Sequence, residues 1–464
     1  MASYAAAMGH YPPRRAAFAW AMFDWAAQPF FTLVTTFVFA PYFSSTLAAN
    51  PVQGQELWGF ATAAAGLAIG ILSPILGSAA DAAGRRKPWI FAFSIPYLFA
   101  CWALWYAVPG NDHAVLIALS SYAIAAISIE IATVFNNAMM PTLVPPTHIG
   151  RLSSFGWAAG YVSGIVCLVI VLGFFAANPQ SGLTLLGFEP AFGLDPAAHE
   201  GDRATGPFST IWYLIFILPL VFFIRETKST MRAGPAIAAG IRDLKNSFSH
   251  ARSHGNVFIF LIANMAYKDG LVAMFAFGGI YAAGQLGWGT IEIGIFGIIL
   301  IVTGTVGLSV SGPADDRFGP KIVIIVSLAA LFVAGVGVVS IDRNTVFFFV
   351  EVDQPASGTL FGSWPDRLFV FWASLIGLAS GPLQSSSRSM LIRLAPREHM
   401  AQFFGLFALS GKVTSFLAPL AVGLVTLLTD SQAAGMSAVL AFYAIGMILL
   451  LQVKDTPPET IQTA

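Results

Sequence analysis

The chain has 464 residues, of which 56% are hydrophobic and only 10% are charged. Soluble chains carry about 25% charged residues, so this composition excludes a soluble protein and indicates a polytopic membrane protein. The 23 Lys and Arg balance the 23 Asp and Glu, which excludes a basic field for nucleic acid. Cys101 and Cys167 lie in separate apolar runs, which excludes a disulfide framework and a cysteine metal site.

Apolar runs long enough to cross a bilayer, about 20 residues each, recur twelve times. Their expected cores are 17–43, 57–80, 88–108, 114–138, 152–178, 209–225, 256–283, 289–312, 321–341, 367–392, 402–428 and 433–453. The runs are too long and too evenly apolar for the strands of an outer-membrane barrel. The sequence therefore predicts an all-α membrane protein with twelve transmembrane helices. No short signal-peptide core precedes the first run, so we expect that helix to be retained.

Lys and Arg in the connections between the runs predict the orientation. The connections on the side of the termini, together with the termini, hold 17 of these residues, whereas the other side holds only Arg203, Arg343 and Arg367. Because positively charged loops stay in the cytoplasm, we expect both termini there. Arg outnumbers Lys and Ala is abundant, which is typical of a GC-rich bacterial genome. We therefore expect a bacterial inner membrane.

A loop pattern, G-x-x-x-D-x-x-G followed by a base, joins runs 2 and 3 and recurs between runs 8 and 9. The predicted gating residues in these loops are Gly77, Asp81, Gly84, Arg85, Gly312, Asp316 and Gly319. At a second place in the repeat, Gly160 of the first half corresponds to Gly411 of the second half. Repeated halves are the usual construction of secondary transporters. We expect two six-helix pseudo-repeat bundles, over 1–225 and 256–464, joined by a cytoplasmic linker over 226–255. The two aspartates are predicted to control the conformational equilibrium.

The repeated loop resembles the cytoplasmic signature of the major facilitator superfamily. Further stretches resemble the autophagy-related vacuole-effluxer-like family within it, and these are 23–26, 141–146, 150–157, 387–389 and 403–412. The resemblance covers most of the chain. It implies a two-bundle transporter whose central cavity is lined by spans 1, 4, 7 and 10. Fungal members are associated with amino-acid export from the vacuole. The resemblance therefore also implies that the substrate is a small organic solute, with amino acids as the leading class.

Polar side chains inside the runs are the candidate substrate and coupling residues, because a charge in mid-bilayer is costly unless paired or hydrated. The candidates are Asp24, Gln28, Glu130, Asn137, Lys268, Asp269, Gln384, Arg388 and Lys412. Asp24 and Gln28 share one helix face, as do Gln384 and Arg388, which resembles a cavity lining. Arg388 is predicted to hold a substrate carboxylate or to pair with a carboxylate from another span. The alternative is a set of ion pairs that only hold the bundle together.

All seven histidines fall in loops or tails, so a proton relay has to use carboxylates. We expect Asp24 to be the leading proton site and Asp269 the second, because the adjacent Lys268 favours an ionised Asp269. The alternative for Asp24 is a gate formed by pairing with Lys412 or Arg388.

A faint resemblance to a nucleotide-binding loop at 405–414 fails on spacing and lies in an apolar run. No catalytic motif accompanies the candidate residues. We therefore expect a secondary transporter working by alternating access, with a small-molecule substrate, lipid as its surroundings, and no enzyme activity, metal, nucleotide or cofactor beyond a coupling proton. The alternatives are a sugar or drug carrier of the same fold, and a transporter-fold sensor that binds without flux.

Overall fold

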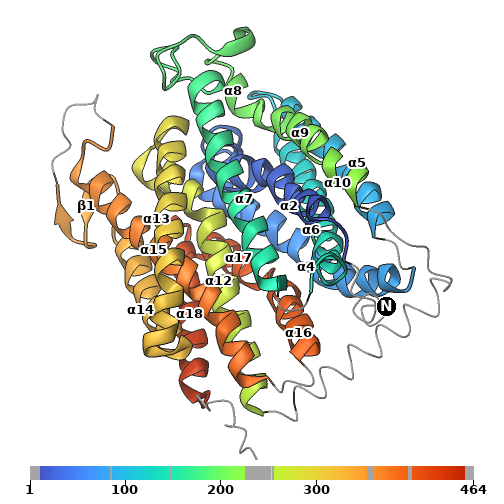
Figure 1. Cartoon of the computed structure of the whole chain (residues 1–464). Helices are drawn as coiled ribbons and strands as arrows, with labels where there is room; N and C mark the ends of the chain where they lie inside the picture. The colour runs from blue at the N-terminus through green and yellow to red at the C-terminus, as the bar shows by residue number, and fades with distance from the viewer. Residues whose placement is uncertain are drawn as a thin grey trace, which may run out of the picture. The chain divides into compact units, whose positions relative to one another are not determined.

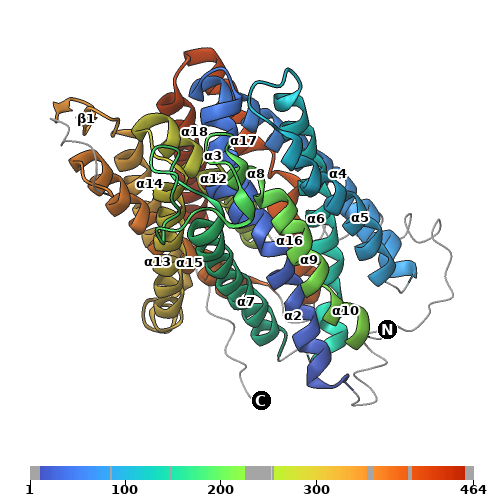
Figure 2. The ribbon, with the colours of Figure 1, turned by 90° about the horizontal axis from the view of Figure 1, so that it is seen from above.

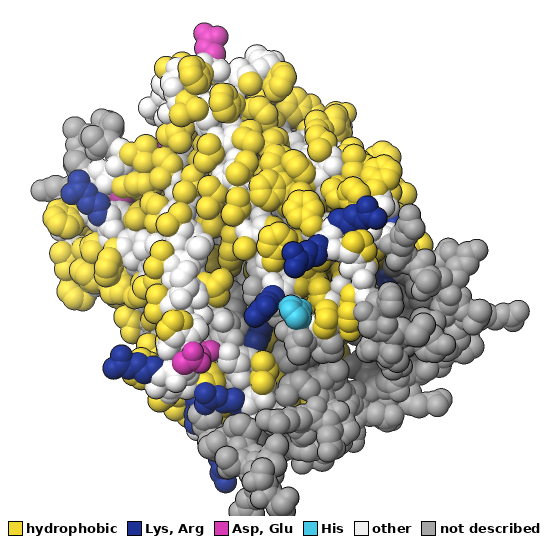
Figure 3. All heavy atoms as spheres, in the orientation of Figure 1, with side chains coloured by type: hydrophobic (Ala, Val, Ile, Leu, Met, Phe, Trp, Pro, Cys, Tyr) yellow, Lys and Arg dark blue, Asp and Glu magenta, His cyan; other side chains and the backbone are white. Residues whose placement is uncertain are grey.

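The computed structural model describes residues 11–83, 86–145, 148–224, 252, 255–352, 360–395 and 400–454 (Figure 1). Among these residues, twelve helices are long and apolar enough to cross a membrane, which confirms the predicted fold class. The spans are Arg14–Leu47, Pro51–Gly77, Lys87–Tyr106, Ala114–Met140, Arg151–Phe175, Glu200–Phe223, Gly255–Leu286, Thr290–Phe318, Pro320–Val339, Trp364–Leu394, Leu409–Thr429 and Gln432–Gln452. Hydrophobic side chains cover much of the helix surface in view in Figure 3, as contact with lipid requires.

The chain forms two compact units. The first contains Met1–Ala48 and Ile71–Arg242, and the second contains Ala49–Gly70 and Asp243–Ala464. The boundary after Arg242 falls within the expected linker, most of which lies outside the described residues, as do Gly84, Arg85 and the side chain of Asp81.

Helix α4 (Pro51–Ala83) contributes its first part to the second unit. There the Gln55 amide donates to Thr426 Oγ1 at 2.8 Å, and a Cβ built on Gly59 would lie 2.9 Å from the Cα of Gly423. Glycine at this crossing lets the two helix backbones touch.

The first unit contains the following elements in chain order. They are α2 (Arg14–Pro29), η1 (Phe30–Phe37), α3 (Phe39–Tyr42), η2 (Phe43–Leu47), α5 (Lys87–Ala103), η3 (Leu104–Tyr106), α6 (Ala114–Leu143), α7 (Ile149–Ile170), η5 (Val171–Phe175), η6 (Ala191–Gly193), α8 (Glu200–Arg203), α9 (Thr205–Phe216) and α10 (Leu218–Phe223). Figures 1 and 2 show α2 and α7 side by side, and α5 packs along α6.

The first span changes its winding at Pro29. Proline has no N–H, so the Trp25 carbonyl loses its partner one turn earlier in the helix. Ser163 Oγ donates to that carbonyl at 2.8 Å, and Trp212 Nε1 donates to it at 3.1 Å. After the proline the chain continues as the π-helix η1, a winding that is frequent at functional sites.

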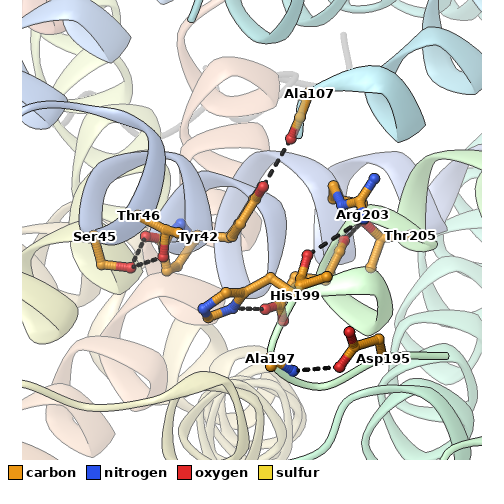
Figure 4. Close-up of polar contacts among 12 residues, drawn as sticks. Tyr42, Ser45, Thr46, Ala107, Asp195, Ala197, His199, Arg203 and Thr205 are labelled. Carbon is orange, nitrogen blue, oxygen red and sulfur yellow. Dashed lines mark hydrogen bonds and ion pairs between the residues drawn. The ribbon is translucent and has the colours of Figure 1, made fainter. Parts of the chain in front are cut away.

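The sixth span begins earlier than its predicted core, 209–225, because the charged turn at Glu200–Arg203 is helical and buried. Arg203 Nη1 donates to the Trp105 carbonyl at 2.8 Å, and its guanidinium lies 4.8 Å from the centre of the Trp105 ring. Asp202 Oδ2 lies 2.8 Å from His199 Nδ1. The five residues from His199 to Arg203 carry four charged or titratable side chains and read as a loop in sequence. Inside the protein these side chains pair with one another and with the Trp105 carbonyl (Figure 4).

The second unit contains, after the first part of α4, seven helices and one hairpin among its described residues. They are α12 (Gly255–Leu286), α13 (Thr290–Phe318), α14 (Pro320–Val339), β1 (Thr345–Val346), β2 (Val350–Glu351), α15 (Trp364–Leu394), α16 (Met400–Val413), α17 (Leu417–Thr429) and α18 (Gln432–Gln452). Helix α13 packs along α15, and α12 packs along α18. Span 11, unlike the single run that the sequence predicts, is interrupted between α16 and α17.

Candidate functional site

A polar stripe on α2 and the start of η1 lies against a row of glycines on α7. The α2–α7 seam consists of Asp24, Gln28, Thr32, Gly156, Gly160 and Gly164. A Cβ on Gly160 would lie 3.1 Å from Gln28 Oε1, and one on Gly164 would lie 2.9 Å from Thr32 Oγ1. Glycines at every fourth position therefore let polar side chains fit between two helices that pack closely.

Asp24 is the most confined member of this seam. A Cβ on Gly156 would overlap Asp24 Oδ2 and would lie 2.9 Å from the Trp20 ring. The Trp20 indole N–H is occupied, because it donates to the Asn136 carbonyl on α6 at 2.7 Å. Among the described residues, none forms a hydrogen bond or ion pair with the half-buried Asp24 carboxyl. This carboxyl is therefore available to a proton or a ligand.

The second unit carries a related arrangement, the α12–α16 seam, which consists of Asn264, Lys268, Phe407, Ser410 and Gly411. The Lys268 ammonium lies 5.6 Å from the centre of the Phe407 ring, within cation–π range. A Cβ on Gly411 would lie 2.7 Å from Lys268 Cδ, and Asn264 Nδ2 donates to Ser410 Oγ at 3.4 Å. The matched glycines Gly160 and Gly411 thus each receive a polar side chain from the first helix of their own half.

Asp269, next to Lys268, is almost completely buried. Thr414, directly after α16, lies near the carboxyl, and its hydroxyl donates to the Ser410 carbonyl at 3.4 Å. The Oδ1 atom has no hydrogen-bond partner among the described residues. The interruption of span 11 therefore lies beside a buried carboxylate, and discontinuous helices of this kind surround ion and substrate sites in other transporters.

The other candidate residues lie as follows. Glu130 on α6 and Lys412 at the end of α16 are half-buried, while Asn137 is exposed and its neighbour Asn136 is the buried one. On α15 the Gln384 amide donates to the Ser380 carbonyl of its own helix at 3.4 Å, and Arg388 one turn later is half-buried.

The second gating loop is built around Asp315 in addition to the predicted Asp316. Asp315 is buried and accepts a hydrogen bond from Ser386 Oγ on α15 at 2.6 Å, whereas Asp316 is exposed. Gly319 ends α13 with φ +82°, a conformation that favours glycine. Gly77 and Gly312 have open space where a Cβ would stand. The roles predicted for the loop residues stay predictions.

One lysine in each half closes the end of the sixth span of that half. Lys87, the first residue of α5, donates to the Val221 and Ile224 carbonyls at 2.7 and 2.8 Å. Lys321, near the start of α14, donates to the Val453 carbonyl at 2.6 Å. Both lysines follow the repeated loop, so the repeat in sequence produces a repeated contact between the third and sixth helices. An ammonium at these carbonyls also suits the negative end of the helix dipole.

Sequence reasoning did not single out the glycine row of α7, Asp315 or the contacts of the two lysines. The glycine row has a signal, because Gly156, Gly160 and Gly164 form two overlapping G-x-x-x-G patterns in an apolar run. Asp315 differs from Asp316 only by one register position, which a spacing pattern does not decide.

The sequence model of the vacuole effluxer Atg22-like family matches residues 59–456. The chain belongs to this family. An uncharacterised MFS-type transporter of Bacillus subtilis, YxiO, is 23% identical over 444 residues, which is 94% of each chain. Autophagy-related protein 22 of Yarrowia lipolytica is 24% identical over 341 residues, or 66% of this chain. The chain spans about half the length of that fungal relative, 50% of which is covered.

Solved structures of the major facilitator fold resemble the Atg22-like chain over nearly its full length. A D-xylose–proton symporter gives a TM-score of 0.64 at 13% identity, covering 96% of this chain and 97% of that one. The nucleoside transporter NupG gives 0.61 at 13% identity, covering 95% and 97%. At this identity the likeness concerns the fold alone. Together with the family membership, it makes the protein a secondary transporter of the major facilitator type and not an enzyme.

Proposed function

We propose that this Atg22-like transporter moves a small organic solute by alternating access, with amino acids as the first substrate class and a proton bound at Asp24 as the coupling ion. The observation that carries the proposal is the Asp24 carboxyl, which is half-buried in the α2–α7 seam with no hydrogen-bond or ion-pair partner among the described residues. A carboxyl in a membrane span without a partner is costly unless it exchanges protons or binds a ligand.

The Asp24→Asn variant tests the coupling step in proteoliposomes. We expect it to lose uptake driven by a pH gradient and to keep substrate exchange at equal pH, because the amide keeps the shape of the carboxyl but cannot release a proton. Loss of exchange as well would make Asp24 a gate or a packing residue. Gradient-driven accumulation by the variant would remove Asp24 from the mechanism and would leave Asp269 as the next carboxyl to replace.

The substrate class rests on the bases of the second unit. Lys268 and Arg388 are the half-buried basic side chains proposed to hold a substrate carboxylate. Arg388→Lys should raise the substrate concentration needed for half-maximal uptake if the contact is bidentate, because lysine offers a point charge instead of a planar fork. Full transport by Arg388→Ala would exclude both a carboxylate contact and an essential ion pair at this position.

A thermal-shift screen of the purified protein against amino acids, peptides and sugars identifies the cargo, because a ligand that binds only the folded state stabilises it by mass action. We expect amino acids to raise the melting temperature and sugars to leave it unchanged. Stabilisation by sugars alone would favour a sugar carrier of the same fold. Binding without flux in proteoliposomes would indicate a sensor.

We further propose a bacterial inner membrane with both termini in the cytoplasm, supported by the uneven distribution of Lys and Arg. Fusing a reporter that is active only in the cytoplasm to the C-terminus tests this orientation. A fusion that is made in normal amounts but is inactive would show that the C-terminus lies on the opposite side of the membrane.

A further inference from the structure

The connection between α14 and α15 contains a short hairpin whose turn consists of three consecutive phenylalanines. Strand β1 (Thr345–Val346) pairs antiparallel with β2 (Val350–Glu351), and Val346 faces Val350 in the register. The turn residues Phe347, Phe348 and Phe349 are 43%, 64% and 81% exposed. Three large apolar rings exposed in water would be unfavourable, since each is worth about 1.5–3 kcal/mol when buried.

The turn holds these rings in a conformation that phenylalanine rarely adopts. Phe347 and Phe348 have φ +54° and +71°, in the left-handed region where Asn and Gly are preferred. Strain of this kind persists only where the surroundings impose it, and it concentrates at functional segments. The Phe348 N–H donates to the Ser340 carbonyl at 2.9 Å, which ties the turn to the end of α14.

The base of the hairpin is rigid and polar. Asp342 Oδ1 accepts the Asn344 and Thr345 N–H groups at 2.7 and 2.8 Å, and Oδ2 accepts the Thr345 hydroxyl at 2.7 Å. Arg343 and Glu351 add exposed polar side chains at the same end. The hairpin is thus polar at its base and apolar at its tip, with little freedom to fold its rings inward.

The position of the hairpin indicates what covers the rings. It begins six residues after α14 ends at Val339, and the helices on either side of it also carry exposed apolar side chains, Val333 on α14 at 52% and Phe371 on α15 at 58%. In both Figure 1 and Figure 2 the hairpin projects sideways from α14 and α15 instead of covering the ends of these helices. Figure 3 shows hydrophobic side chains along the same left edge.

We propose that this hairpin is a membrane-interface anchor, which inserts Phe347, Phe348 and Phe349 into the boundary between lipid headgroups and acyl chains on the side opposite the termini. Apolar side chains buried at this boundary, with charged groups left at the headgroups, are the chemistry by which interfacial segments bind lipid. The anchor would hold the α14–α15 connection at a fixed depth while the helices move.

The test measures the depth of a nitroxide on single-cysteine variants in lipid vesicles. Cys101 and Cys167 are buried, so the chain without an added cysteine should take up no label. Glu351→Cys places the label at the base of the hairpin and leaves the phenylalanines intact. Gln180→Cys, in an exposed turn, is the water reference, and Val333→Cys on α14 is the lipid reference.

We expect the ratio of collisions with oxygen to collisions with a water-soluble nickel chelate at position 351 to lie between the two references. Replacing the three phenylalanines by serine should lower this ratio by roughly threefold, because the rings carry the insertion. If the triple variant does not fold, Phe349→Ser alone, the most exposed ring, should lower it by a smaller amount.

Two results would overturn the proposal. One is a ratio at position 351 equal to that at Gln180→Cys, which places the hairpin in water. The other is low collision with both reagents, which indicates burial against a second copy of the chain or another protein. A ratio that the serine replacements leave unchanged would also count against the rings as the anchor.

Discussion

The two seams share one backbone arrangement, a glycine facing a polar side chain, but the charges of their polar side chains differ. In the first unit the amide of Gln28 lies over Gly160, and in the second unit the ammonium of Lys268 lies over Gly411. One turn earlier, the first unit has the carboxyl of Asp24 and the second has the amide of Asn264, which is bonded to Ser410. The comparison shows that the two halves share the glycine contact but place side chains of different charge on it.

The largest effect should come from replacing a glycine that faces a rigid neighbour. Gly156→Ala would press its methyl group against the Trp20 indole, which cannot move because its N–H is bonded to α6. We expect a loss of about 1–3 kcal/mol of unfolding free energy, typical of overpacking, and a loss of transport. Gly411→Ala is the matched control, because it meets only the flexible end of Lys268. Equal melting temperatures for the two variants would contradict the difference between the seams.

The next effect concerns the lysines that the two halves share. Lys87→Met and Lys321→Met keep the apolar stem but remove the donors to the final carbonyls of α10 and α18. Each should lower the unfolding free energy by about 1.5 kcal/mol, the value of a hydrogen bond to a charged group. Denaturant unfolding in detergent measures it. A loss in only one variant would show that the contact is not equivalent in the halves.

A smaller effect separates the neighbouring aspartates of the second gating loop. Asp315→Asn weakens the bond from Ser386, and we expect a loss of about 1 kcal/mol in unfolding free energy. Asp316→Asn, at the exposed position, should leave stability unchanged and reduce turnover if its predicted gating role holds. Thermal unfolding and uptake rates measured on the same preparations check both expectations. If Asp316→Asn lowered the stability more than Asp315→Asn, the stabilising contact would not lie at Asp315.

The smallest effect is expected from Lys268→Met, which loses a cation–π contact of about 0.5–1 kcal/mol but retains the stem over Gly411. Its melting temperature should therefore change little, while uptake falls if the ammonium holds substrate. Gln28→Met is the control in the other seam. Uptake unaffected by either variant would limit Lys268 and Gln28 to packing roles.

The twelve spans followed from the sequence because apolar length is a property of composition, and the contacts at the seams did not follow because they depend on rotation about the helix axis. Asn137 and Asn136 illustrate this limit, since adjacent residues on α6 face exposed and buried surroundings. The buried Arg203 shows a second limit. Its carbonyl and ring partners come from Trp105, almost a hundred residues earlier, and no local pattern predicts such a pairing.

The carbonyl that Pro29 leaves without a partner has a mechanical consequence. Because Ser163 and Trp212 both bind the oxygen of Trp25, three helices share one point of attachment at the place where α2 changes its winding. A tilt of α2 at that point either carries α7 and α9 with it or breaks both bonds. The absence of an N–H group on Pro29 thus ties spans 1, 5 and 6 together at one carbonyl, so these three spans are expected to move as one unit about that point.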